Sequence, residues 1–345
     1  MRSSIGNLLL AVAVLAGVSG AAERPNILFC ISDDQSYAHA GANGDPVIST
    51  PAFDRIAREG VLFSHAFCDA PTCGPSRSAI LTGQPIWRLE EAGNIHSTLP
   101  KKFATYTEGL EKAGYFVGHT GKGWSPGRDG PGGRTQNAAG VPYVRLQYGK
   151  GDLKNVAKPR GMSSNAYAKN FAEFLGKRPK GKPFCFWLGT REPHRGYQRD
   201  LWKAKGRDPS KVIVPPWLPD HPEVRKDILD YFHEIEHFDR EVGEAVAALE
   251  KIGELDNTIV VVTSDHGMPF PRAKASLYDS GARVPLAIRW PGGIKSPGRT
   301  FEGLVNLSDL APTFLEAAGI KPPLMMVAHS LLDVLSSAKA TPRTS

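Results

Sequence analysis

Two acidic pairs in this sequence stand in similar surroundings, although they are more than 200 positions apart. Asp33-Asp34 follows a continuous apolar run, and Asp265-His266 follows a β-branched run. Three carboxylates in close contact repel one another, and burying them unpaired is costly, so a divalent cation is the simplest way to bring them together. Oxygen ligands favour calcium or magnesium over softer metals, and His266 adds a nitrogen ligand or a hydrogen-bond donor. Each pair alone would serve equally well as loop caps, but the recurrence favours a metal site.

A cysteine in a distinctive setting supplies a second reactive group. Cys73-Gly74-Pro75-Ser76-Arg77 follows one expected strand and opens an expected helix that starts near Ser76. As a thiol, Cys73 is either an ordinary buried residue or a nucleophile. A cysteine nucleophile needs a partner base, and a thiolate prefers a softer metal than an oxygen-rich site offers. The residues alone leave this mismatch open.

Strand-like and helix-like segments alternate along the chain. Apolar and β-branched runs predict strands, and apolar residues at three- and four-residue steps predict helices. The expected strands are 26–31, 61–67, 115–120, 183–189, 258–263 and 284–290; the other expected helices are 51–60, 107–113, 164–176, 222–253 and 308–318. This alternation predicts an α/β fold, a three-layer sandwich with a mostly parallel central sheet flanked by helices.

Several polar side chains directly follow expected strands. In open parallel sheets, ligands bind outside the carboxyl ends of the strands. We therefore expect these residues to lie along one edge of the sheet: Asp33, Asp34, Lys122, His194, Asp265 and His266. One further polar residue, Asp239, interrupts an otherwise apolar stripe in the expected helix 222–253.

Composition narrows the class of function. The formal net charge of +7 favours anionic substrates by long-range attraction. The sequence shows no basic helix, RNA-binding aromatic signature or zinc finger, so we expect no nucleic-acid partner. Cys30 and Cys185 stand in apolar runs that suit buried free thiols. If Cys73 is oxidised, three cysteines remain, and at least one is unpaired or pairs with another chain.

The first 22 residues resemble a secretory signal peptide. Arg2 precedes the apolar run Leu8–Val18, and small residues follow at 19–22. The run is too short to span a bilayer, so we expect cleavage near Gly20–Ala22 and an exported protein without a membrane span. An uncleaved membrane anchor is the alternative.

Together these motifs resemble the sulfatase family, within the alkaline-phosphatase superfamily. Cys73 followed by Pro75-Ser76-Arg77 matches the signature at which a formylglycine-generating enzyme oxidises cysteine to formylglycine. The resemblance implies that the aldehyde hydrates to a diol, that one hydroxyl group attacks sulfur, and that the other then expels sulfate. It also implies a cation, Ca²⁺ in preference to Mg²⁺, held by Asp33, Asp34, Cys73, Asp265 and His266.

The resemblance also implies roles for the basic residues. Arg77 would hold the formylglycine hydroxyl group and nearby metal ligands. Lys122 and Lys274 would bind sulfate and stabilise the charge that grows on the bridging oxygen, with Arg272 as a substitute for Lys274. His194 would protonate the leaving group or contact sulfate.

One position departs from the family pattern. Many sulfatases carry a histidine two positions after the lysine that corresponds to Lys122, and this chain has Trp124 there. Either His119 or His194 then supplies the proton, or Trp124 shapes the substrate pocket. His266 stands where asparagine is common, a change that the family also shows.

The segments Asp265–Pro271 and Glu192–Arg195 look most like the heparan N-sulfatase branch, whose members cleave sulfate or sulfamate groups from sugars. We expect a catalytic domain at 23–320, and at 321–345 a short remnant or disordered tail in place of the family's usual small C-terminal domain. The expected function is hydrolysis of sulfate esters, or sulfamates, on a sulfated oligo- or polysaccharide. The alternatives are a phosphodiesterase or phosphonate hydrolase of the same superfamily, and a noncatalytic glycan-binding homologue. The expected location is periplasmic or extracellular, or lysosomal in a eukaryote.

Overall fold

A nine-stranded mixed sheet forms the centre of the computed structural model, which describes residues 24–340. The expected signal peptide lies outside this range. The strand order is β4-β3-β5-β1-β6-β8-β2-β7, and β9 also pairs with β2. The strands are β1 Asn26–Ser32, β2 Val61–Phe67, β3 Phe116–Gly121, β4 Val141–Pro142, β5 Phe184–Gly189, β6 Thr258–Ser264, β7 Arg283–Val284, β8 Leu286–Arg289 and β9 Arg299–Asn306.

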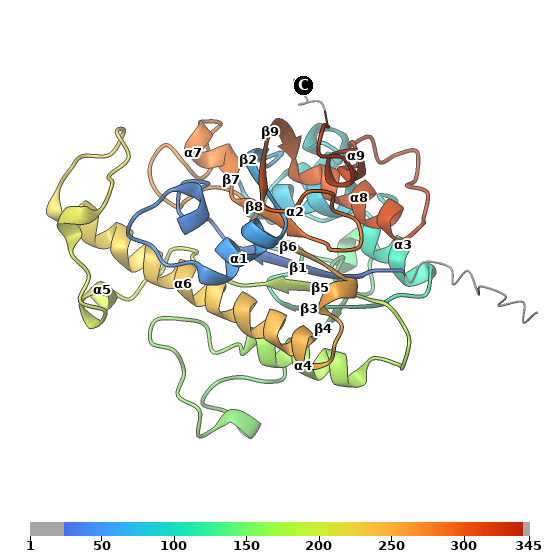
Figure 1. Ribbon diagram of the computed structural model, residues 1–345, viewed down its shortest axis with the longest axis horizontal. Coiled ribbons are helices and arrows are strands. Elements are labelled where there is room, and N and C mark those ends of the chain that lie inside the picture. Colours follow the sequence, from blue (N-terminus) through green and yellow to red (C-terminus); the bar gives the residue numbers. More distant parts are fainter. Residues whose placement is uncertain (1–23, 341–345) are drawn as a thin grey trace, which may run out of the picture.

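Helices cover both faces of this sheet (Figure 1). Successive residues of β1 point to opposite faces, so Phe29 and Ile31 belong to one hydrophobic cluster while Leu28 and Cys30 belong to the other. The first cluster also contains side chains of α2 (Cys73–Thr82), α3 (Tyr106–Lys112), α8 (Leu310–Ala317) and α9 (Leu332–Ser336). The second contains side chains of α1 (Pro51–Glu59), α4 (Tyr167–Lys177) and α6 (Pro222–Lys251). The predicted three-layer α/β architecture is confirmed.

The sheet differs from the sequence expectation in the part that contains β8, β2, β7 and β9. The single strand expected at 284–290 is interrupted at Pro285, which has no N–H to donate to a ladder, and forms β7 and β8. Both strands run antiparallel to β2, and β8 is also antiparallel to β6. Strand β9, parallel to β2, was not expected, because Glu302 and Gly303 interrupt its apolar pattern. Two short helices, α5 (Leu201–Ala204) and α7 (Asp279–Ala282), were also not expected.

The polar residue on the apolar stripe of α6 caps another helix. The carboxylate of Asp239 accepts hydrogen bonds from the backbone N–H groups of Ala52 (3.0 Å) and Phe53 (2.8 Å), in the first turn of α1. Thr50, which precedes the helix, instead accepts a hydrogen bond from the N–H of Gly41 (2.8 Å). Asp239 therefore satisfies N-terminal donors that would otherwise be buried without partners.

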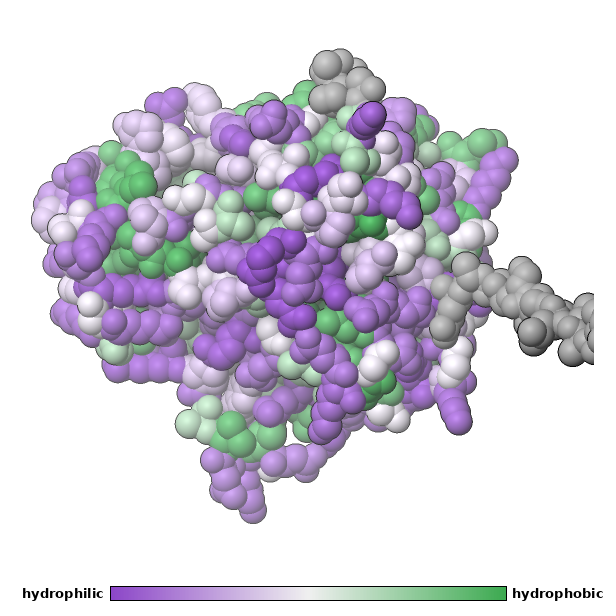
Figure 2. Space-filling view, in the orientation of Figure 1, coloured by the Kyte–Doolittle hydropathy of each residue, from purple (hydrophilic) through white to green (hydrophobic). Residues whose placement is uncertain are grey.

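The outer surface is mostly hydrophilic, with scattered apolar patches on the face shown in Figure 2. Helix α6 is 30 residues long but carries charged residues throughout. Neither α6 nor any other helix within residues 24–340 is long and apolar enough to cross a bilayer. All four cysteines are buried and free, as expected for Cys30 and Cys185.

The segment after residue 320 packs against the rest of the domain. Leu331 and Leu335 are buried in the same cluster as α8. The backbone N–H of Leu331 donates a hydrogen bond to the hydroxyl group of Thr313 (2.7 Å), and Arg299 donates to the carbonyl oxygen of Val334. Residues 321–340 therefore contribute to the core.

We expect Leu331→Ala to lower the free energy of unfolding by about 2–5 kcal/mol, because truncation of a fully buried leucine leaves a cavity. Leu324→Ala is the matched control, since Leu324 is 94% exposed and its loss should change the value by less than about 0.5 kcal/mol. Urea unfolding followed by circular dichroism measures both. Equal effects of the two substitutions would show that the segment does not stabilise the domain.

Candidate active site

The two acidic pairs meet at the carboxyl ends of neighbouring strands. β1 and β6 are parallel and Ser32 pairs with Ser264, so the residues that follow each strand emerge side by side. The backbone N–H of Asp34 donates a hydrogen bond to Asp265 Oδ1 (3.1 Å). Asp34 has a φ of 77°, a left-handed conformation that aspartate tolerates better than most residues. Strand pairing thus brings together residues that lie far apart in the sequence.

Cys73 is the first residue of α2, three residues before the expected helix start near Ser76. Its Sγ lies 3.4 Å from Asp33 Oδ1, 3.8 Å from Asp34 Oδ1 and 3.3 Å from His266 Nε2, and the residue is only 2% exposed. The partial positive charge of the helix N-terminus therefore lies beside the acidic cluster and favours an anion there.

These side chains form a compact set of metal-ligand donors. One ligand atom from each of Asp33, Cys73, Asp265 and His266 lies within 4.8 Å of all the others, and all four residues are buried. Burial, followed by repulsion from Asp265, raises the pKa of Asp33. The set is rich in carboxylate oxygens, and the charged form of Asp33 is disfavoured in it. A hard divalent cation fits such a set. The thiol of Cys73 is the one soft atom in the set.

His266 is oriented toward this cluster by its backbone. Its Nδ1 lies 3.0 Å from the carbonyl oxygen of Gly267, which leaves Nε2 at 3.0 Å from Asp34 Oδ1 and 3.7 Å from Asp265 Oδ1. Burial alone would lower the pKa of His266, but the two neighbouring carboxylates outweigh it and raise the pKa well above its usual value. A ring held in this way directs Nε2 into the cluster, where a bound cation would take the place of the proton on Nε2.

Arg77 joins the cluster from the first turn of α2 and is fully buried. Its Nε donates to Asp265 Oδ2 (2.9 Å), and its Nη1 donates to the carbonyl oxygens of Lys122 (2.7 Å) and Gly123 (3.1 Å). Its Nη2 lies 3.6 Å from Asp33 Oδ1 and makes no hydrogen bond within the described residues. This free donor, buried beside Asp33, could bind one more oxygen atom.

Two lysines complete the charge balance. Lys122 Nζ lies 2.6 and 2.5 Å from the carboxylate oxygens of Asp33, and Lys274 Nζ lies 3.0 and 2.7 Å from those of Asp34. Lys274 Nζ is also 3.7 Å from Cys73 Sγ. Arg272, the proposed substitute for Lys274, instead stacks over the ring of Tyr278 at 4.5 Å. The geometry therefore places Lys274, and not Arg272, at the cluster.

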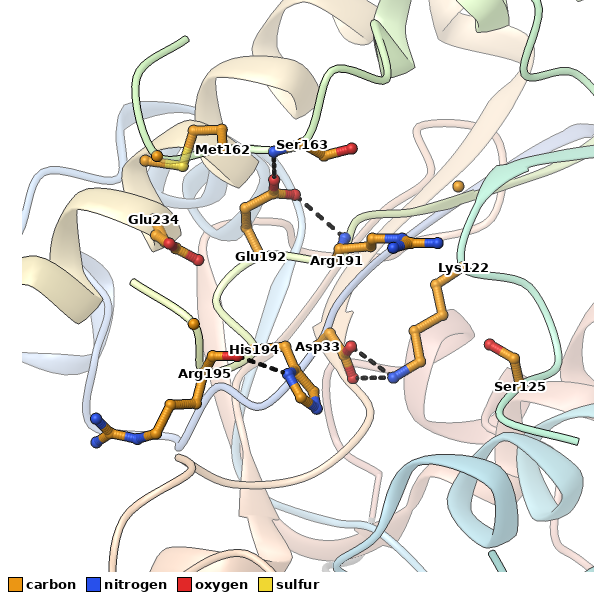
Figure 3. Close-up of a pocket in the computed structure, with 13 residues that line it drawn as sticks. Asp33, Lys122, Ser125, Met162, Ser163, Arg191, Glu192, His194, Arg195 and Glu234 are labelled. Carbon is orange, nitrogen blue, oxygen red and sulfur yellow. Dashed lines mark hydrogen bonds and ion pairs between the residues drawn. The ribbon is translucent and has the colours of Figure 1, made fainter. Parts of the chain in front are cut away.

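His194 faces a pocket of about 440 Å³ that opens beside the cluster (Figure 3). Asp33 and Lys122 line the same pocket, and His194 lies close enough to join a second donor set with Asp33, Asp34 and Cys73. His194 itself is exposed, and its Nδ1 lies 3.1 Å from the carbonyl oxygen of Arg195.

The two other residues considered for this role lie elsewhere. Trp124 is buried in the core, where its indole N–H donates to the hydroxyl group of Ser78 (2.8 Å), so the idea that it shapes the pocket is wrong. His119 is also buried outside the pocket lining, with its Nδ1 2.9 Å from the carbonyl oxygen of Gly140. Burial lowers the pKa of His119 to about 4. Of the alternatives, only His194 faces the pocket.

The residues of the opposite pocket wall were not predicted from the sequence. Glu192 is buried and accepts hydrogen bonds from the N–H groups of Ser163 (2.6 Å) and Arg191 (3.1 Å) and from the hydroxyl group of Tyr167 (2.9 Å). Because Glu192 lies two residues before His194, the sequence could have indicated that Glu192 belongs to the site. Glu234, on α6, also lines the pocket. The sequence could not distinguish it as a site residue, because the helix carries many other charged residues.

Comparison with known proteins identifies the family. The sulfatase family model matches residues 25–320. The chain belongs to the sulfatase family. An ulvan-active sulfatase of Formosa agariphila is 30% identical over 338 residues, which cover 94% of this chain and 60% of that protein. Human N-sulphoglucosamine sulphohydrolase is 29% identical over 332 residues, covering 91% of this chain and 64% of the human protein. The chain thus spans less than two thirds of the length of either sulfatase relative.

Solved sulfatase structures share the fold. The PsFucS1 sulfatase of Pseudoalteromonas sp. superposes with a TM-score of 0.68 at 23% identity, covering 93% of this chain and 73% of that one. The match of the sulfatase family model confirms the family resemblance drawn from the Cys73 motif and the two acidic pairs.

We expect the sulfatase-family chain to bind Ca²⁺ stoichiometrically, and Asp33→Asn and Asp265→Asn each to weaken binding at least about 100-fold, because each removes one charged ligand. Calorimetric titration of metal-stripped protein measures this. The matched control is Asp220→Asn, since Asp220 pairs with Arg225 away from the cluster. Undiminished calcium binding by both site variants would remove the proposed metal centre.

Proposed function

We propose that this chain hydrolyses sulfate esters on a carbohydrate, using position 73 as formylglycine together with a divalent cation, most simply Ca²⁺. The observation that carries the proposal is the place of Cys73, which lies at a helix N-terminus and within 3.8 Å of Asp33, Asp34 and His266. A nucleophile at this position would share a cation with carboxylates from two distant parts of the chain.

Oxidation of Cys73 would remove the mismatch between a soft thiol and a hard-cation site. Formylglycine would supply a hydrated aldehyde with one hydroxyl group to attack sulfur and another to drive release of sulfate. The cation would supply positive charge that favours the ionised form of the attacking hydroxyl group. Arg77 Nη2, buried without a hydrogen-bond partner in the described chain, would donate to that side chain.

The basic residues would act on the sulfate group itself. Lys122 and Lys274 now neutralise Asp33 and Asp34, and a cation bound to those carboxylates would free both ammonium groups for sulfate oxygens. Fixed cations at these atoms stabilise the charge that grows as the S–O bond breaks. His194, on the pocket side, would protonate the departing oxygen or nitrogen atom.

The substrate class follows from the pocket and from the relatives. A polar pocket of about 440 Å³ can hold a sugar ring, and the net charge of +7 attracts a polyanion. The two relatives are named for sulfatase action on ulvan and on N-sulphoglucosamine. We infer a sulfated oligo- or polysaccharide as substrate, with a sulfamate as a possible variant of the same reaction.

Maturation must precede folding in this scheme. Cys73 is buried, so a separate formylglycine-generating enzyme could reach it only in the unfolded chain. Residues 1–22 would direct export of the chain, and this order of events requires that oxidation happens before the exported chain folds.

We expect that co-expression with a formylglycine-generating enzyme replaces one sulfur and two hydrogens of Cys73 by one oxygen, as mass spectrometry of the peptide would show. The modified protein should hydrolyse 4-nitrophenyl sulfate, and Cys73→Ala should lower kcat by about 10⁴-fold or more because it removes the nucleophile. Cys68→Ala, which removes another buried thiol, is the control.

Near-wild-type turnover by Cys73→Ala would mean that the nucleophile lies elsewhere. Faster hydrolysis of bis(4-nitrophenyl) phosphate than of the sulfate would instead support the phosphodiesterase alternative.

We expect Lys274→Ala to lower kcat/KM for an aryl sulfate by about 10²–10³-fold, since it removes a fixed cation beside the reacting group. Arg272→Ala, two positions away, should remain near wild type because Arg272 stacks on Tyr278. Steady-state kinetics on the two variants makes the comparison, and a larger loss in Arg272→Ala would reverse the assignment.

A further inference from the structure

A row of buried titratable residues runs along one side of α6 at three- and four-residue steps: Asp230, Glu234, His237 and Glu241. The two outer carboxylates bind neighbouring chain segments. Asp230 accepts hydrogen bonds from the N–H groups of Asp200 (2.9 Å) and Trp202 (3.0 Å). Glu241 accepts from the N–H group of Ala168 (2.8 Å) and the hydroxyl group of Tyr148 (3.2 Å). Both therefore have structural partners.

Glu234 differs from them because its carboxyl group lines the substrate pocket. The residue is only 4% exposed, yet no residue within 24–340 forms a hydrogen bond or ion pair with its side chain. Figure 3 shows Glu234 and Lys122 on opposite sides of the pocket. A buried carboxyl group without a protein partner, at a site that receives substrate, is a group that a ligand can satisfy.

The charges around Glu234 limit what that ligand can be. The nearby Glu192 already accepts hydrogen bonds from two backbone N–H groups and Tyr167. Arg195, a cation of the same pocket, is held by Asp227 at 2.9 and 3.2 Å and stacks on Phe270. Burial, followed by the charges of Glu192 and Asp230, raises the pKa of Glu234 to about 9. This end of the pocket is therefore acidic, and Glu234 carries a proton at neutral pH.

We propose that Glu234 is a specificity residue, which hydrogen-bonds a hydroxyl or amino group of the sugar ring and disfavours a second sulfate at that position. The inference rests on the proposed function. A protonated carboxyl group both donates and accepts hydrogen bonds, as a hydroxyl group requires, and its carbonyl oxygen accepts from the ammonium group that an amino sugar carries at neutral pH. A sulfate placed there would bring its negative charge beside Glu192 and Asp230. The lysine end of the pocket would bind the sulfate to be removed, and the acidic end would select rings without another one.

Direct binding tests this selectivity without depending on turnover. The probes are glucosamine 6-sulfate, glucose 6-sulfate and glucosamine N,6-disulfate, with ligand-observed NMR titration of the full calcium-loaded protein. We expect the wild type to bind at least one singly sulfated sugar about tenfold more tightly than the disulfate. Glu234→Gln should keep this preference, because an amide also donates and accepts. Glu234→Ala should reduce it to about threefold or less, because it removes the hydrogen bond to the singly sulfated sugar and leaves only the repulsion of the second sulfate by Glu192 and Asp230.

Glu244→Gln is the matched control, because Glu244 lies on α6 but is exposed and outside this pocket. Tighter wild-type binding of glucosamine 6-sulfate than of glucose 6-sulfate, lost in Glu234→Ala, would identify an amino group as the partner of Glu234, and equal binding of both monosulfates would identify a hydroxyl group.

Three results would overturn the inference: a wild type that prefers the disulfate, a wild type that binds none of the probes, or a preference that Glu234→Ala leaves undiminished. Hydrolysis of 4-nitrophenyl sulfate is measured separately. Its absence would refute the proposed function, whereas the binding preference is decided by the titrations.

Discussion

Burial of three carboxylates at one point is the constraint on which the rest of the site depends. Asp33, Asp34 and Asp265 are all almost fully buried, and their mutual repulsion must be balanced locally. Arg77 neutralises Asp265, while the two lysines neutralise the others. Buried pairs of this kind contribute little net stability, because desolvation offsets their attraction, but removing one partner costs about 3–5 kcal/mol. The cluster is therefore a functional arrangement that the surrounding core must stabilise.

Sheet topology explains how this arrangement arises from distant segments. Parallel pairing of β1 with β6 brings the two acidic pairs together. β8 runs antiparallel to both β6 and β2, so the two reversals give β2 the same direction as β6. The chain that leaves β2 consequently reaches Cys73 at the same edge of the sheet. The antiparallel strand, which departs from a purely parallel α/β plan, still leaves Cys73 on the same side as the two acidic pairs.

The sequence predicted the parts of the structure that repeat a local pattern. The central strands, the helices flanking them and the edge position of Asp33, Asp34, Lys122, Asp265 and His266 all follow from apolar runs that end in polar residues. Strand β9 was not predicted, because a charged residue and a glycine break its apolar pattern, and its strand structure depends on pairing with β2. Trp124 was misplaced for a related reason, since a position next to a strand end does not show which way the side chain points. Glu234 could not be predicted, because its burial depends on how α6 packs against loops far away in sequence.

One half of the pocket consists of residues fixed at the ends of central elements, and the other half consists of residues that loop contacts hold in place. Cys73, Arg77 and the acidic pairs are fixed by burial at the ends of central elements. His194 is exposed, and its position depends on its neighbours: Glu192 ties this segment to Ser163, and Arg195 is bound to Asp227. In the proposed function, interactions that hold sulfate would act mainly in the transition state, whereas those that contact the sugar would bind substrate and transition state alike. Separating the two at opposite ends of one pocket would allow the choice of sugar to change through residues such as Glu234 without disturbing the charge balance among the buried carboxylates.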